Sequence, residues 1–301
     1  NLYLRTFAVN GMLNDRGVPI GGMMGFLKSL AYAIRETNPT RLIVTYDGAG
    51  GSQRRRKLHP NYKGNRKPGK RITRWDAFKN VEEEKQAMKI QFSRLLEYLD
   101  TLPINVISID RIEADDTIAY ITNNLLKDEV IIMSADQDFL QLVNDRVTVW
   151  SPIKKIFYTP EKVLEDYGVP AHNFLMYKIL MGDKSDNLEG VKGLGPKKLP
   201  KILPDISSNP LDLDFILDYA SKGTEPMHKR IVESIDQLTL NEKLMDLKNP
   251  PISGELKLQI TRLIEAPINL LSSNNFNTMY TDDQMGNAID IPDIWLKQHF
   301  T

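Results

Sequence analysis

Acidic residues gather in three short segments whose carboxylates could hold metal ions. The segments are Glu113-Ala114-Asp115-Asp116, Asp136-Gln137-Asp138 and Asp183-Lys184-Ser185-Asp186. Carboxylates that lie close together repel one another and destabilise a fold unless cations lie between them. Sites built only from oxygen atoms favour hard cations such as Mg²⁺ and Mn²⁺. A metal-dependent reaction on phosphate groups is the chemistry that these segments indicate first.

The apolar pattern predicts elements that would bring these acids together. It predicts strands over 42–46, 104–109, 130–133 and 147–150, the last followed by a hairpin to 156–158, and helices over 23–37, 76–100 and 113–126. Strands that alternate with helices indicate an α/β fold with a mainly parallel sheet. Such sheets bind ligands outside the carboxyl ends of their strands. Asp47 and Asp136 lie directly at such ends and Glu113 lies a few residues past one, so we expect a single crevice.

Each acidic segment also has an ordinary structural interpretation. An acidic first turn is common in helices, which accounts for 113–116 by itself. An Asx-turn or helix cap accounts for 136–138, and a solvated loop after the helix over 173–181 accounts for 183–186. The metal hypothesis therefore depends on the conjunction of all three segments with Asp47.

The segment from Gly48 to Trp75 is strongly basic. It carries ten lysines and arginines and no acidic residue, although the whole chain has 39 basic and 39 acidic residues. Surface loops usually mix charges of both signs, so this segment favours a polyanion such as nucleic acid as partner. Tyr62 and Trp75 lie in the same segment and could stack on bases.

A glycine-rich turn covers Gly190-Val191-Lys192-Gly193-Leu194-Gly195-Pro196-Lys197-Lys198. Pro196 is typical of a first helical turn, so we expect a helix after it. Backbone amides at such a turn can bind a DNA phosphate, assisted by the two lysines. The alternative interpretation is a plain corner between two helices.

Composition excludes several classes. The chain has 301 residues, of which 41% are hydrophobic, so it can bury a sizeable core. It has no cysteine and its four histidines are scattered, which excludes a disulfide framework and a thiolate or histidine metal site. No apolar run reaches membrane-spanning length and no secretory signal is visible.

The motifs together resemble the 5′-nuclease (flap endonuclease) family, which includes the 5′-nuclease domain of bacterial DNA polymerase I and phage enzymes. The matching segments are 62–66, 113–116, 134–138, 181–187 and 193–197, in an order and spacing that fit over residues 1–205. Segments 150–152 and 178–183 are most similar to the free-standing T-even-phage ribonuclease H type. The resemblance implies a PIN-like core over 1–168 with a helical arch over about 54–90. It also implies a helix–three-turn–helix DNA-binding region over 169–255 and a tail over 256–301.

The resemblance also implies roles for individual residues. The first metal ion would be held by Asp47, Glu113, Asp115 and Asp116, and the second by Asp136, Asp138, Asp183 and Asp186. Lys63 and Arg66 would contact the scissile phosphate. The residues that would contact DNA elsewhere are Arg5, Tyr62, Gly193, Gly195, Lys197 and Lys198. The ions would be two Mg²⁺, for which Mn²⁺ can substitute, with K⁺ at the 190–197 turn.

By resemblance, the chain would be a monomeric replication nuclease acting on branched or 5′-ended DNA and RNA–DNA primers, in the host cytoplasm if phage-encoded. Partners would include a single-strand binding protein or sliding clamp, although no clamp-binding motif is evident. The family has a strand and an aspartate just before the position of Asn1, so we expect a longer natural sequence. The alternatives are a catalytically impaired DNA-binding protein, a PIN-type ribonuclease and a small-molecule phosphatase, the last disfavoured by the basic segment.

Overall fold

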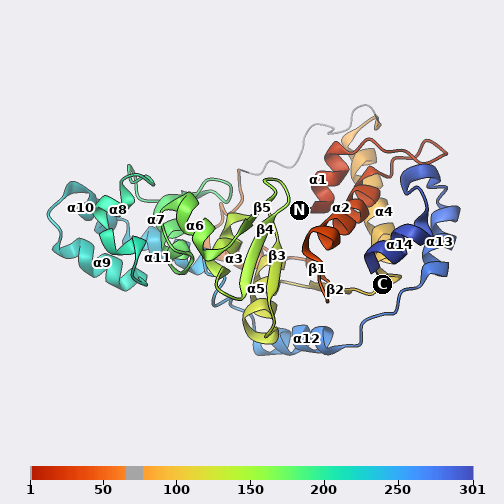
Figure 1. Ribbon diagram of the computed structural model, residues 1–301. Helices are drawn as coiled ribbons and strands as arrows, with labels where there is room; N and C mark the ends of the chain where they lie inside the picture. Colours follow the sequence, from red (N-terminus) through yellow and green to blue (C-terminus); the bar gives the residue numbers. More distant parts are fainter. Residues whose placement is uncertain (1, 66–76, 301) are drawn as a thin grey trace. The chain divides into compact units, whose positions relative to one another are not determined.

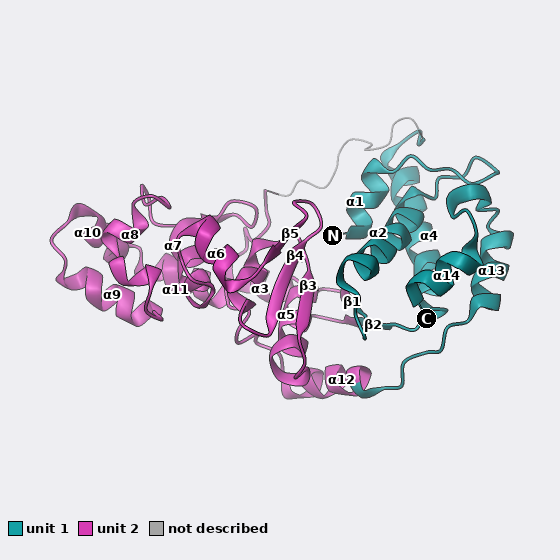
Figure 2. Cartoon of the chain, viewed as in Figure 1, with its two compact units in different colours: residues 1–44, 67–107, 265–301 teal, residues 45–66, 108–264 magenta. Residues whose placement is uncertain are grey.

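The computed structural model describes residues 2–65 and 77–300. The chain forms two compact units, each assembled from separate stretches of sequence (Figure 2). Unit 1 comprises residues 1–44, 67–107 and 265–301, and unit 2 comprises residues 45–66 and 108–264. The sequential division at residues 168 and 255 stays a prediction.

Unit 1 is helical over most of its described length. Its helices are α1 (Leu2–Val9), α2 (Gly21–Thr37), α4 (Val81–Asp100), α13 (Ser273–Asp282) and α14 (Pro292–Phe300), with a short 3₁₀ turn η5 (Gly286–Ala288). The predicted helix over 23–37 is confirmed as α2. The helix predicted from residue 76 begins at Val81, because the Asn80 side chain accepts a hydrogen bond from the Glu83 amide and caps it there. The core includes Tyr98, whose ring packs edge-on against Phe276.

Strands β1 (Ile43–Asp47) and β2 (Asn105–Ile109) pair in a two-stranded sheet, and the boundary between the units falls within both strands. Burial alternates along β2: residues 105, 107 and 109 are buried, and residues 106 and 108 are exposed. The last residue of β1 is Asp47, so this acid lies at the carboxyl end of a strand as predicted.

The main sheet of unit 2 has three strands. β3 (Val130–Met133) pairs with β4 (Val147–Ser151) in parallel, and β4 pairs with β5 (Ile156–Tyr158) in an antiparallel hairpin. A third small sheet joins β6 (Gly182–Asp183) and β7 (Leu188–Glu189). The predicted mixed α/β class is confirmed, but the described strands form three separate sheets and not one mainly parallel sheet.

Helices make up the rest of unit 2 (Figure 1). They are α3 (Gln53–Leu58), α5 (Ala114–Tyr120), α6 (Pro160–Tyr167), α7 (Phe174–Met181), α8 (Leu199–Ile202), α9 (Leu213–Lys222), α10 (Pro226–Glu233), α11 (Ile235–Met245) and α12 (Gly254–Glu265). Shorter segments are η1 (Ile121–Leu125, a π-turn), η2 (Gln137–Leu142), η3 (Ala171–Asn173) and η4 (Pro204–Ser207). The expected helix after Pro196 begins only at Leu199, since residues 195–198 still form a turn.

The core of unit 2 lies between the main sheet and the helices that follow it. Ile132 and Val149 from the sheet and Phe174, Ile179 and Leu180 from α7 belong to one buried cluster. This cluster fixes α7 beside the strand ends, and α7 ends at Gly182, whose positive φ of 73° is readily adopted only by glycine. The acidic segment 183–186 follows that stop. Over the described residues, no helix is both long and apolar enough to cross a membrane.

Candidate functional site

The first acidic segment opens helix α5 and is tethered to the end of β1. Glu113 is the N-cap residue of α5, and the Ala114 amide donates to Asp47 Oδ1 at 2.8 Å. Glu113 and Asp116 are buried, whereas Asp115 keeps 26% of its side-chain surface exposed. The strand end and the helix start therefore bring Asp47 next to the 113–116 segment, as the sequence predicted.

Arg55 lies at the centre of this acidic cluster, which the sequence did not single out. Its guanidinium donates to Glu113 Oε2 at 2.5 Å and to both Asp116 oxygens at 2.7 Å. It also donates through Nε to the Leu244 carbonyl at the end of α11, 2.9 Å away. Arg55 is only 3% exposed. The sequence did not distinguish Arg55 because it is one of ten basic residues in its segment.

Lys63 reaches the same cluster from the turn that follows α3. Its ammonium lies 2.6 Å from Glu113 Oε1, and its φ of 55° turns the backbone sharply at this residue. The Lys63 amide donates to the Asp186 carbonyl at 3.0 Å, and the Asn187 side chain donates to the Asn61 carbonyl at 3.1 Å. The turn over 61–65 therefore joins the first acidic segment to the third.

Tyr62 has a different environment from the one predicted. The ring is 3% exposed, with the Lys63 ammonium 4.8 Å from its centroid and its hydroxyl 3.4 Å from Glu113 Oε2. In this arrangement the ring packs in the core of unit 2 and no face is open to a nucleic-acid base. Base stacking by Tyr62 stays a prediction that requires the turn to move. Arg66 and Trp75 lie outside the described residues.

The second and third acidic segments meet at Lys178. This lysine is on α7, and its ammonium lies 2.9 Å from Asp138 Oδ1 and 2.5 Å from Asp183 Oδ2. Lys178 is 7% exposed and is the only charged residue of α7, which was a signal available in the sequence. Asp138 therefore comes together with Asp183, and the Asp186 amide donates to Asp183 Oδ1 at 3.3 Å.

Local turns use some of the carboxylate oxygens. Asp136 Oδ1 accepts from the Asp138 amide at 3.0 Å, and Asp183 Oδ1 accepts from the Ser185 amide at 2.7 Å. These are the Asx-turns of the ordinary structural interpretation. They leave the other oxygen of each carboxylate for an ion or a cation of the chain, so the turn and the metal interpretations are compatible.

The environment changes the pKa values of four acids in opposite directions. Burial raises the pKa of Asp115 to about 7 and that of Asp138 to about 6, against the pull of Arg55 and Lys178 respectively. Burial would also raise the pKa of Glu113, but Arg55 and Lys63 outweigh it and lower the pKa. The pKa of Asp183 is likewise lowered, since Lys178 and the Ser185 hydrogen bonds outweigh burial.

The donor set fits a hard divalent cation in its chemistry, because every candidate ligand is a carboxylate. The geometry is not yet that of a metal centre: among residues 2–65 and 77–300, no group of three or more acids or histidines is arranged to hold an ion. Arg55, Lys63 and Lys178 instead neutralise the acids. Metal binding would require at least the two lysine ammonium groups to move away.

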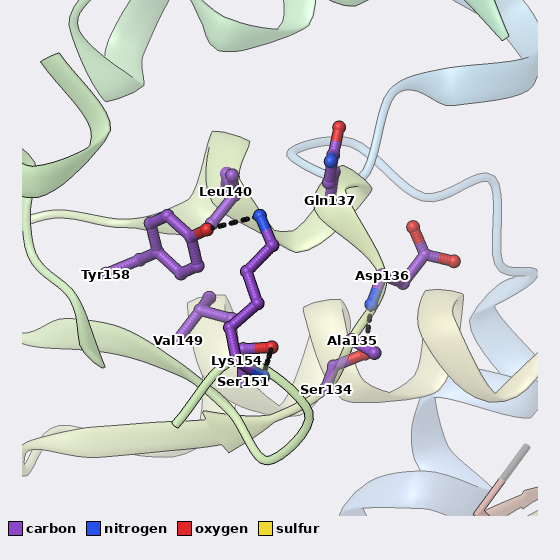
Figure 3. Close-up of a pocket in the computed structure, with 9 residues that line it drawn as sticks. All are labelled: Ser134, Ala135, Asp136, Gln137, Leu140, Val149, Ser151, Lys154 and Tyr158. Atoms are coloured by element: carbon purple, nitrogen blue, oxygen red, sulfur yellow. Dashed lines mark hydrogen bonds between the residues drawn. The ribbon is translucent and has the colours of Figure 1, made fainter. Parts of the chain in front are cut away.

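A shallow pocket opens beside Asp136, at the carboxyl end of β3 (Figure 3). The Lys154 ammonium donates to the Tyr158 hydroxyl at 2.9 Å, and Figure 3 shows the Asp136 carboxylate turned away from it. Gln137 and Ser151 also line the pocket. Lys154 therefore lines the same pocket as Asp136, a candidate metal ligand. The sequence had placed Lys154 only in the β4–β5 hairpin.

The glycine turn before α8 carries a second basic group. Gly193 has a φ of 82°, and Lys197 and Lys198 are exposed. Lys198 donates to the Gly193 carbonyl at 3.1 Å, and Arg230 on α10 donates to the Lys192 carbonyl at 3.3 Å. Two carbonyls of the turn thus already accept from cations of the chain, where K⁺ was predicted. Arg230 was not predicted.

Arg5 lies on α1 in unit 1 and is exposed. The other predicted site residues that the structure describes lie in unit 2. Within unit 2, three groups result: the acids around Arg55 and Lys63, the acids around Lys178, and the basic turn before α8.

The amino-terminal part of the chain matches a known family over residues 1–168, described as the 5′-3′ exonuclease, N-terminal resolvase-like domain. The chain belongs to this 5′-3′ exonuclease family. The predicted resemblance is thereby confirmed, and the family match covers α1 to α6, a stretch that includes the first two acidic segments.

Two curated relatives extend the match beyond that domain. The chain is 32% identical over 286 residues to DNA polymerase I of Bacillus subtilis (strain 168), which covers 91% of this chain and 28% of the relative. It is 30% identical over 256 residues to a 5′-3′ exonuclease of the same organism, which covers 82% of this chain and 79% of the relative. The chain therefore spans less than a third of the polymerase and most of the exonuclease.

A solved structure supports the fold. The D15 flap endonuclease of bacteriophage T5, crystallised as a pseudo-enzyme-product complex with DNA and metal ions, superimposes with a TM-score of 0.63 at 22% identity. The match covers 94% of each chain. At this level of identity the likeness concerns the fold alone, and it extends through the helices that follow the family domain.

Proposed function

We propose that the chain is a structure-specific 5′-nuclease that hydrolyses phosphodiester bonds in branched or 5′-ended DNA, or in RNA–DNA primers, during replication. The observation that carries the proposal is the meeting of Lys63 with Glu113 and, through the 61–65 turn, with Asp186. These contacts bring Lys63, the candidate phosphate-binding cation, together with the first and third acidic segments in unit 2. The chain's membership of the 5′-3′ exonuclease family supports a nuclease role for this arrangement.

The acids would hold two divalent ions, Mg²⁺ by preference and Mn²⁺ as a substitute. When bound, such ions supply an activated water and stabilise the leaving oxygen. Asp115 and Asp47 belong to the first group of acids, and Asp136, Asp138 and Asp183 belong to the second. The relatives support this proposal, because the bacteriophage T5 protein of the same fold was crystallised with DNA and metal ions.

The basic residues of the chain would bind and orient the substrate. Lys63, once released from Glu113, would neutralise the charge that develops on the scissile phosphate. Arg66 is proposed for the same role by resemblance. Lys197, Lys198 and the amides of the glycine turn would hold the duplex backbone, which fixes the distance from the duplex to the acids. K⁺ at this turn and a clamp or single-strand binding partner stay predictions.

The test is the cleavage of an internally labelled 5′-flap DNA with Mg²⁺ or with EDTA, beside a 3′-flap DNA and a single-stranded RNA. We expect metal-dependent products from the 5′ flap alone. Metal-independent binding of the flap without products would identify a catalytically impaired DNA-binding protein. Products from the RNA alone would identify a PIN-type ribonuclease.

A further inference from the structure

We propose that Arg55 is a positioning residue of the acidic cluster and that Asp116 is its anchor and not a metal ligand, which leaves Asp115 as the ligand supplied by the first turn of α5. The proposal rests on the metal site of the proposed function. It divides the roles of two neighbouring acids that the sequence treats alike.

Both oxygens of Asp116 are engaged by Arg55. Its Oδ1 accepts from Arg55 Nη2 and its Oδ2 from Arg55 Nη1, each at 2.7 Å. A carboxylate held by both arms of one guanidinium is bound in a planar, paired geometry, and a metal ion must compete with the guanidinium for the same two oxygens. The side chains are only 4% and 7% exposed, so water cannot replace the lost partner if the pair opens.

The guanidinium is itself fixed from a third side. Arg55 Nε donates to the carbonyl of Leu244 at the end of α11, and Nη1 also donates to Glu113. Asn241, one turn earlier on α11, donates to the carbonyls of Ile179 and Glu189, so α11 is tied to the end of α7 and to β7. Arg55 is thus held by the Leu244 carbonyl, which is not a metal ligand, as well as by its acidic partners. Its position sets the position of Glu113 and Asp116.

Asp115 points elsewhere, because successive residues of a helix differ by about 100° around its axis. Its nearest approach to Arg55 is 4.0 Å, too long for a hydrogen bond, and 26% of its side chain is exposed. The cations that approach the other acids do so differently: Lys63 and Lys178 are single ammonium groups on flexible stems, which can withdraw when an ion binds.

A double-mutant cycle between Arg55→Met and Asp116→Asn tests the proposal. Asp115→Asn is measured in the wild type and in the Arg55→Met variant. The first readout is the unfolding temperature in EDTA. The second is Mn²⁺ affinity, from titration followed by electron paramagnetic resonance. Each member of the pair, changed alone, is expected to lower the unfolding temperature by at least ~4 °C. The double variant is expected to lose less than the sum, since a contacting pair is coupled.

For Mn²⁺, Arg55→Met, Asp116→Asn and the double variant are expected to weaken affinity by one common factor, in the range of ~10–100-fold for residues that orient ligands. Asp115→Asn is expected to weaken it at least tenfold more when added to Arg55→Met. If Asp116→Asn weakens Mn²⁺ binding further in the Arg55→Met background, or the two temperature effects simply add, the proposal is overturned.

Two further variants keep the outcome decisive. If Arg55→Met does not fold, Arg55→Lys replaces it in the cycle, because an ammonium keeps the charge and loses the paired geometry. Arg56→Met, on the exposed side of α3, is the matched control and is expected to match the wild type in both readouts. A wild-type chain that binds no Mn²⁺ would refute the metal site and the ligand role of Asp115, whereas the temperature cycle would still report the Arg55–Asp116 pair separately.

Discussion

The ammonium of Lys63 donates to the Oε1 atom of Glu113 at 2.6 Å, and Arg55 holds the other oxygen of the same carboxylate. The candidate phosphate-binding residue is therefore engaged by an acid of the site. An ion that binds Glu113 would release Lys63 toward the substrate. In the proposed mechanism, metal binding and phosphate binding would thus be coupled through one side chain.

Changing Lys63 to alanine tests its part in this coupling. We expect the cleavage rate of the 5′ flap to fall by ~100–1000-fold, because a preorganised cation is lost where charge develops. The DNA dissociation constant should change by less than ~5-fold, since Lys63 is one of several cations that would contact DNA phosphates. Single-turnover kinetics and fluorescence anisotropy measure the two effects. Equal losses in rate and affinity would make Lys63 a docking contact only.

Asp138→Asn should lower the cleavage rate by ~100-fold or more, because it removes a negative charge from the second group of acids. DNA affinity in EDTA should stay within ~2-fold of the wild type or improve slightly, since a negative charge is lost. The matched control is Asp166→Asn on α6, an acid paired with Lys162 and outside the candidate site. An active Asp138→Asn variant would show that this acid is dispensable.

The metal-free protein should lose stability as pH rises from about 4 to about 7. The pKa values of Asp115 and Asp138 are raised by burial to about 7 and about 6, so the folded state binds more protons than the unfolded state in this window. Stability then falls with pH until both acids are ionised in the folded state. Glu113 and Asp183 act oppositely at lower pH, because their pKa values are lowered.

Calorimetry in metal-stripped buffers measures this dependence. Asp115→Asn should flatten the decline, because it removes one of the two groups that cause it. Mg²⁺ at millimolar concentration should restore stability at pH 8 more than at pH 5, since the ion binds ionised carboxylates. A flat profile for the metal-free wild type would mean that neither acid is protonated in the folded state at pH 5.

Gly193→Ala should destabilise the turn before α8 by about 1–3 kcal/mol. The residue has a φ of 82°, and an added Cβ would lie 2.9 Å from Arg230 Nη1. Gly195→Ala is the matched control, because no atom lies within 4 Å of the position that an added Cβ would take and its φ is not in the left-handed region. Urea unfolding compares the two. Equal stabilities would show that the turn can relax around the methyl group.

Arg230→Met should weaken duplex binding and reduce the slope of log affinity against log salt concentration by about 0.9, the loss of one phosphate contact. Lys222→Met on α9 is the control, as an exposed lysine paired with Asp218. An unchanged slope for Arg230→Met would restrict this residue to holding the Lys192 carbonyl.

The sequence indicated the surroundings of those acids that lie at the end of a strand or the start of a helix. Asp47 ends β1, Asp136 follows β3 and Glu113 caps α5, and the structure brings Asp47 next to the 113–116 segment as the pattern indicated. Lys178 was not predicted, although it is the lone charge on an apolar helix and that signal was present in the sequence. The same reasoning predicted the helix that became α2 and the strands on either side of the first acidic segment.

Arg55 and Tyr62 could not be assigned in this way. Arg55 has basic neighbours on both sides, and only the turn of α3 decides which of them faces inward. Tyr62 lies beside Lys63 in a polar segment that suggests exposure, yet the turn buries it. The start of α4 was placed too early because Phe78 continues the apolar period beyond the cap at Asn80.

The tie between the 61–65 turn and the 183–187 segment has a consequence for how related chains can diverge. The Lys63 amide donates to the Asp186 carbonyl, the Asn187 side chain to the Asn61 carbonyl, and the Asn65 side chain to the Lys184 carbonyl, so the two segments are joined at three points. Insertions or deletions within either segment would break these contacts and displace Lys63 from Glu113. Length variation among homologues should therefore be confined to the stretches between these segments. Position 187 should keep a side chain that can donate a hydrogen bond, whereas position 61 can vary because it supplies only its backbone carbonyl.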